Sequence, residues 1–132
     1  MPTVEIRADI GNITNILNDG VGALIPHTFM QVIGPDGTKT TVGFKPLNEG
    51  SILSPGQVAD DTIHQFDATS GQIQITDQQY RDLMDYIDRM KNNPPVYDII
   101  GGEQCASWAV NGLRDAGIIS GAIAPQGIAL YD

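Results

Sequence analysis

The sequence predicts an α+β fold in a single domain that covers residues 1–132. Strand-like segments come before, between and beside two helical segments, without the regular alternation that a parallel βαβ sheet needs. The length fits one domain, because domains usually contain about 100–150 residues. A hydrophobic content of 41% with 17% charged residues is enough for a core and argues against disorder.

The clearest element of the first half is a β-hairpin. Residues 1–24 are interpreted as a helical or irregular N-terminal segment, because apolar residues recur there at helical spacing between glycines. Residues 25–33 and 38–44 are rich in β-branched and aromatic side chains, and they flank the turn-forming tetrapeptide Gly34-Pro35-Asp36-Gly37. This pattern predicts two paired strands.

Two helices are predicted in the second half. Prolines and glycines at 46–56 first indicate a loop, and residues 57–75 contain short strand-like runs. The tetrapeptide Thr76-Asp77-Gln78-Gln79 then has the form of a capping box, and it opens a helix with one apolar stripe. The second helix is expected from about Glu103 to Ala116, immediately before a glycine.

Charge and composition exclude several classes of function. The chain has 7 basic and 16 acidic residues and a net charge of −9, so nucleic acid and anionic membranes would repel it. No segment approaches the roughly 20 apolar residues that span a bilayer, and no signal peptide pattern is visible. Neither a metal nor a cofactor is expected: there is one cysteine, and Asp60-Asp61 with Asp67 lacks calcium-loop spacing and reads as solvated turn carboxylates.

The single cysteine, Cys105, is predicted to lie in the first turn of the second helix. The positive end of a helix dipole and free amide groups favour a thiolate, which is the nucleophilic form. The preceding Gly102 would let a ligand approach the main chain closely. The alternative is that Cys105 is a small, inert hydrophobic residue that faces the core beside Trp108.

A nucleophilic thiol needs a base, and the chain has two histidines. His27 begins the first strand of the predicted hairpin. His64 lies in a polar segment and is interpreted as a solvated residue near acidic side chains.

The order of these features has a parallel in a known group of enzymes. The features are the strand that begins at His27, the turn Pro35-Asp36-Gly37, Gly43-Phe44 before Pro46, Pro55-Gly56 before Val58, and Gln104-Cys105 on a helix. Together they resemble a circularly permuted papain-like cysteine hydrolase of the NlpC-related group, in which the histidine strand precedes the cysteine helix. The likeness covers residues 25–118 and is greatest to bacterial effector domains of type VI secretion and polymorphic toxin systems. It implies an antiparallel sheet packed against the cysteine helix.

The resemblance implies Cys105 as nucleophile and His27 as general base. Gln104 stands where the family often has asparagine, and it either holds the oxyanion or is an exposed first-turn residue. Pairing around the predicted turn sets His27 opposite Phe44, with Thr41 and Lys45 nearby, so a dyad oriented by a hydroxyl such as Thr41 or by a carbonyl is expected. Tyr97 and Trp108 either line a substrate cleft or pack in the core.

The resemblance further implies a cysteine peptidase or amidase that acts through a thioester, as an antibacterial effector on peptidoglycan. A protease, deamidase or acyltransferase acting on protein or lipid is the alternative within that group. A non-catalytic acidic binding domain is the alternative outside it. We expect a monomer that meets a basic immunity protein, is cytoplasmic in its producer, and is delivered by a secretion apparatus to the target-cell periplasm.

Overall fold

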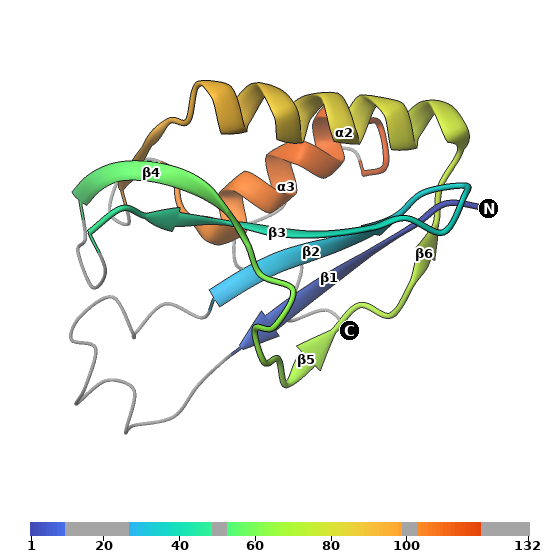
Figure 1. The fold of residues 1–132 in the computed structure, drawn as a ribbon, viewed down its shortest axis with the longest axis horizontal. Helices are drawn as coiled ribbons and strands as arrows, with labels where there is room; N and C mark the ends of the chain where they lie inside the picture. Colours follow the sequence, from blue (N-terminus) through green and yellow to red (C-terminus); the bar gives the residue numbers. More distant parts are fainter. Residues whose placement is uncertain (10–26, 49–52, 99–102, 120–132) are drawn as a thin grey trace.

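The computed structural model describes residues 1–9, 27–48, 53–98 and 103–119 (Figure 1). Its elements are, in chain order, β1 (Thr3–Asp9), β2 (His27–Ile33), β3 (Lys39–Pro46), β4 (Leu53–Asp60), β5 (Ala68–Thr69), β6 (Ile73–Gln74), α2 (Asp77–Asn92), β7 (Val96–Asp98) and α3 (Cys105–Asp115). The predicted α+β class is therefore confirmed.

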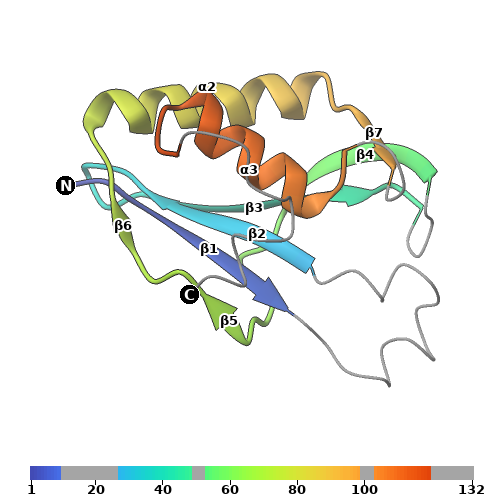
Figure 2. The same ribbon diagram turned by 180° about the vertical axis from the view of Figure 1, so that it is seen from behind.

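The strands form one seven-stranded antiparallel sheet with the order β5-β1-β2-β3-β4-β7, and β6 also pairs with β1. Both helices cover the same face of this sheet, as the views from the front (Figure 1) and from behind (Figure 2) show. Because successive side chains of a strand point to opposite faces, each strand contributes alternate residues to the helix side.

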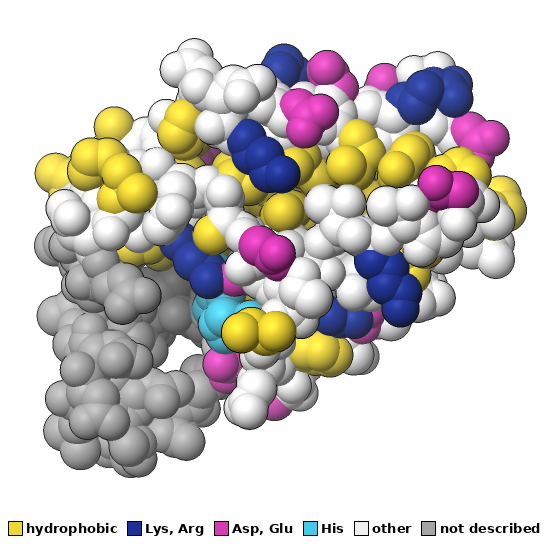
Figure 3. All heavy atoms as spheres, viewed as in Figure 1, with side chains coloured by type: hydrophobic (Ala, Val, Ile, Leu, Met, Phe, Trp, Pro, Cys, Tyr) yellow, Lys and Arg dark blue, Asp and Glu magenta, His cyan; other side chains and the backbone are white. Residues whose placement is uncertain are grey.

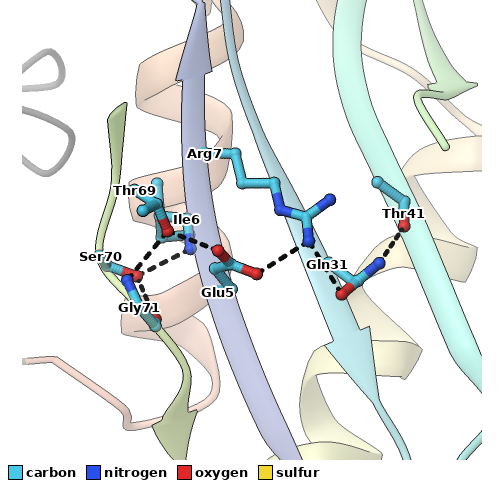
Figure 4. Close-up of polar contacts among 8 residues, drawn as sticks. All are labelled: Glu5, Ile6, Arg7, Gln31, Thr41, Thr69, Ser70 and Gly71. Carbon is cyan, nitrogen blue, oxygen red and sulfur yellow. Dashed lines mark hydrogen bonds and ion pairs between the residues drawn. The ribbon is translucent and has the colours of Figure 1, made fainter. Parts of the chain in front are cut away.

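The core lies between the sheet and the two helices. Its members from the strands include Val4, Ile6, Met30, Val32, Val42, Phe44 and Tyr97, and those from the helices include Leu83, Tyr86, Ile87, Trp108 and Leu113. The opposite face of the sheet is polar. There Glu5 and Arg7 on β1, Gln31 on β2 and Thr41 on β3 form a continuous row of hydrogen bonds across three strands (Figure 4).

The N-terminal segment differs from the prediction. Residues 3–9 form the strand β1, whereas the segment 1–24 was expected to be helical or irregular; residues 10–24 lie outside the described part of the chain. The reason is the alternation of Val4 and Ile6, which face the core, with Glu5 and Arg7, which face the other way. This period of two outweighs the weaker helical spacing.

The two ends of the region 46–56 also differ from the prediction of a loop, while residues 49–52 lie outside the described part of the chain. β3 continues to Pro46, and β4 includes Pro55 and Gly56, which pairs with Pro46. A side chain at Gly56 would overlap the ring of Phe44 and the carbonyl oxygen of Pro95. The glycine therefore serves close packing inside the sheet and does not mark a turn.

The hairpin of β2 and β3 is confirmed, but its register differs by one residue from the prediction. Phe29 pairs with Gly43 and Gln31 with Thr41, so the register continues to Lys45 opposite His27. Phe44 was expected there. A one-residue shift moves a strand's side chains to the other face, so Phe44 enters the core and Lys45 shares the polar face with His27.

Both helices begin and end near their predicted limits. The hydroxyl of Thr76 accepts from the Gln79 amide at 3.0 Å, and the Gln79 side chain accepts from the Thr76 amide at 2.9 Å, which confirms the capping box. α3 runs from Cys105 to Asp115, and Gly117 follows it with a positive φ of 72°. Among the described helices, none is long and apolar enough to cross a membrane.

Candidate functional site

The start of α3 lies against β2 at Thr28, the second residue of that strand. α3 packs against β2 and β3, and the thiol of Cys105 receives a hydrogen bond from the backbone of Thr28, the residue after His27. Gln104 precedes the helix in an extended conformation, and its backbone N–H donates to the hydroxyl of Ser107 at 2.8 Å. Cys105 therefore lies in the first turn of the helix, as predicted, and α3 begins at this residue and not at Glu103.

The thiol of Cys105 is buried, with 2% of the residue exposed. Burial raises the pKa of Cys105, although hydrogen bonds from the backbone of Thr28 and Ala106 and from the side chain of Tyr97 act in the opposite direction. The uncharged thiol is therefore the resting form at neutral pH. This environment agrees with the alternative of a buried cysteine, and the helix amides do not overcome it.

His27 points to the polar face of the sheet, on the same side as Phe29. Its ring stacks on Phe29 with centroids 5.5 Å apart, and the ring of His64 lies 4.6 Å away. Its Nε2 lies 2.8 Å from Oδ2 of Asp61. Burial lowers the pKa of His27 below its ordinary value of 6.5, while the bond to Asp61 opposes this effect. The imidazole is therefore neutral at pH 7.

Asp61 is the partner of His27 that the sequence interpretation missed. Its side chain is fully buried, its Oδ2 binds His27, and its Oδ1 forms an ion pair with Nζ of Lys45. Burial raises the pKa of Asp61, but the hydrogen bonds to His27 and Lys45 outweigh burial. The pKa of this carboxyl group is therefore below its ordinary value of 3.8. An ionised carboxylate only accepts hydrogen bonds, so Nε2 of His27 carries the proton and Nδ1 keeps the lone pair.

The interpretation of Asp61 as a solvated turn carboxylate was therefore wrong. The same interpretation fits Asp60, the residue before it. Asp60 is exposed and accepts a hydrogen bond from the Thr62 amide at 2.8 Å.

One signal in the sequence could have indicated that a group is buried against this part of the sheet. Gly43 interrupts a strand that is otherwise rich in side chains, and a glycine within a strand often marks a place where another group approaches closely.

The other predicted site residues have varied surroundings. The Thr41 hydroxyl accepts from Gln31 at 3.1 Å, as Figure 4 shows, while the Thr41 carbonyl accepts from the Asp61 amide at 2.9 Å. Thr41 thus contacts the backbone of Asp61. Gln104 is 8% exposed, so the exposed alternative does not describe it. Gly102 lies outside the described residues.

The two aromatic candidates lie on the helix side of the sheet. Tyr97 is buried, and its hydroxyl bonds to the thiol of Cys105; burial and the neighbouring thiol raise the pKa of Tyr97. Trp108 is fully buried beside Phe44 and Tyr86. Trp108 therefore fits the alternative of core packing, and Tyr97 is the one that touches the candidate nucleophile.

The polar side of the site reaches the surface. Histidine side chains are visible beside basic, acidic and apolar side chains on the face shown in Figure 3. His64 is partly exposed, with Nδ1 2.7 Å from the carbonyl oxygen of Gln65 and 3.9 Å from Oδ2 of Asp9. Within the described ranges, no group of three or more His, Cys, Asp or Glu residues could hold a metal ion.

Comparison of the chain with protein-family models, curated proteins and solved structures finds no match. The resemblance to papain-like hydrolases therefore depends on the motifs quoted above and on the chemistry of the residues themselves.

Proposed function

We propose that the chain is a cysteine hydrolase of the permuted papain-like type, with Cys105 as nucleophile, His27 as base and Asp61 as the residue that orients the base. One observation supports this proposal most directly: Nε2 of His27 lies 2.8 Å from Oδ2 of the buried Asp61, and the next residue of the strand, Thr28, contacts the thiol of Cys105 through its backbone. A histidine held by a carboxylate and a thiol at a helix start are the components that nucleophilic catalysis uses. Here the imidazole lies on the polar face of the sheet and the thiol on the helix side, next to the following residue of β2.

The proposed reaction uses the neutral imidazole. Nδ1 of His27 takes the proton of the thiol while Sγ of Cys105 attacks the carbonyl carbon of an amide, and the C–N bond then breaks. His27 returns the proton to the leaving amine, which leaves a thioester on the sulfur. Water, deprotonated by the same Nδ1, hydrolyses the thioester and restores the thiol. This sequence requires Nδ1 to reach the thiol around the first residue of β2.

The proposed substrate is a peptide amide of peptidoglycan, and the proposed role is that of an antibacterial effector that acts in the target-cell periplasm. Both come from the resemblance of the motifs. No cofactor is needed, because thiol and imidazole supply the nucleophile and the acid–base group. Protein and lipid substrates are the alternatives if peptidoglycan is not cleaved.

The test compares Cys105→Ala and His27→Gln with the wild type on purified peptidoglycan, with fragments measured by mass spectrometry. We expect release by the wild type, none by Cys105→Ala, and a loss of at least about a hundredfold in His27→Gln. Asp60→Asn is the matched control, because Asp60 is exposed, and it should release fragments like the wild type. Full release by Cys105→Ala would refute the proposal.

A second candidate function is an acidic binding domain for a basic partner such as an immunity protein. The burial and raised pKa of Cys105 and the net charge of −9 favour it. Alkylation by iodoacetamide separates the two candidates. A catalytic thiol must be reachable by reagents in the folded protein and should be alkylated there, whereas the thiol of a binding domain should react only after unfolding. Binding of a basic partner should weaken as salt is added.

A further inference from the structure

The side chain of Asp61 occupies a notch that glycine leaves open in the sheet. Gly43 lies on β3, across from Phe29 on β2. A Cβ at this position would overlap Oδ2 of Asp61 and would lie 3.2 Å from Cε1 of His27. Among the described glycines, those with positive φ are Gly37, Gly71 and Gly117, so Gly43 is required here for space and not for conformation.

Lys45 closes this notch from the solvent side. It lies two residues after Gly43, on the same face of β3, and its Nζ pairs with Oδ1, the oxygen of Asp61 that His27 does not use. The Lys45 side chain is 31% exposed, whereas that of Asp61 is fully buried. The carboxylate therefore has one oxygen on an ammonium group and the other on an imidazole, which prevents its rotation and compensates its charge.

We propose that Lys45 is a positioning residue: by binding Oδ1 of Asp61 it balances the carboxylate, so that His27 needs to donate only one hydrogen bond, from a neutral imidazole, to Oδ2. Without Lys45, the buried negative charge would face His27 alone and would draw a second proton onto the ring. The catalytic meaning of this role rests on the proposed function; the positioning itself does not. Lys45 thus acts on the chemistry through Asp61.

The charged groups around His27 come from two strands, β1 and β3, and from the loop that follows β4. Asp9 on β1 pairs with His27, Lys45 lies on β3, and Asp61 and His64 follow β4. Arg7 lies two residues before Asp9 on β1, on the same face, and its guanidinium donates to Glu5 and Gln31. Of the positively charged groups, Lys45 alone pairs with Asp61 in the described residues, and its removal therefore changes the charge balance of the pair most directly.

The experiment measures the protonation of His27 by ¹⁵N nuclear magnetic resonance across pH, with the ring signals assigned from His27→Gln and His64→Gln. In Lys45→Met we expect the titration midpoint of His27 to move to higher pH, and in Lys45→Arg to stay near that of the wild type. Gly43→Ala should displace Asp61 and move the midpoint to lower pH. Lys39→Met, a matched change of an exposed residue on the same strand, should have no effect.

A second measurement distinguishes positioning from a structural role. The acid limb of the hydrolysis rate should move to higher pH in Lys45→Met, with activity recovered at alkaline pH, whereas a structural defect would lower the rate at every pH. Lys45→Gln, which retains polarity and most of the stem, replaces Lys45→Met if the latter does not fold. An unchanged His27 midpoint in a folded Lys45 variant would overturn the proposal. Because the midpoint is measured without substrate, this result is independent of whether the protein is a hydrolase.

Discussion

Two adjacent carboxylates, Asp60 and Asp61, have opposite environments. Asp60 is exposed and accepts hydrogen bonds within its own turn, while Asp61 is buried and binds His27 and Lys45 from two other strands. A buried charge is tolerated only where partners compensate it. Replacing each of these two carboxylates and comparing the losses in the free energy of unfolding therefore measures how much the His27–Asp61–Lys45 cluster stabilises the folded state.

At the residue scale, we expect Asp61→Asn to lower the free energy of unfolding by about 2–3 kcal/mol, because it leaves Lys45 without its counter-charge. Asp60→Asn should cost no more than about 0.5 kcal/mol, because it changes an exposed turn. Urea unfolding of both variants checks the prediction. Equal losses in the two variants would mean that the buried cluster is not a stabilising contact.

At the scale of elements, the sequence predicts the hairpin and both helices from local patterns, but not the pairing between distant segments. The turn at Gly34-Pro35-Asp36-Gly37 indicates the strands β2 and β3, yet a one-residue error in register assigns Phe44 instead of Lys45 to His27. The partner of His27 lies 34 residues further along the chain. No local pattern reveals that contact, so a dyad was expected where the structure contains a His27–Asp61–Lys45 cluster.

The same limit explains β4. Pro55 and Gly56 have the composition of a loop, and only their packing against β3 and β7 makes them part of a strand. The helix α2 shows the opposite case. Its capping box and apolar stripe are local features, and both appear in the structure as the sequence predicts. Elements specified by local contacts were therefore predicted well, and those specified by tertiary contacts were not.

The N-terminal cap of α2 provides a test at this scale. Thr76→Ala removes the acceptor for the Gln79 amide and should lower the free energy of unfolding by about 1 kcal/mol. Thr76→Ser keeps the hydroxyl and should restore most of this loss. Urea unfolding followed by circular dichroism measures both variants. If the alanine and serine variants are equally stable, the hydroxyl does not cap the helix.

At the scale of the whole molecule, the net charge of −9 sets the overall electrostatic repulsion of other anions, but pH dependence of stability should come from a few individual groups. The pKa of His27 is lowered from 6.5, mainly by burial, so the unfolded chain binds more protons than the folded chain just below pH 6.5. Stability should therefore be complete above pH 6.5 and decrease as pH falls through the folded value. The lowered pKa of Asp61 adds a second loss below pH 3.8.

Urea unfolding at a series of pH values between 8 and 3 tests this prediction. For the wild type we expect a decline that starts near pH 6.5 and a steeper one in strong acid. His27→Gln should remove the first decline, because glutamine does not titrate, while the second remains. Carboxylates are still ionised between pH 6.5 and 5, so the acidic surface contributes little to the slope there. A wild-type stability that is constant or rises from pH 6.5 to 5 would mean that His27 is not buried as a neutral ring, and the neutral base that the proposed hydrolysis requires would be lost with it.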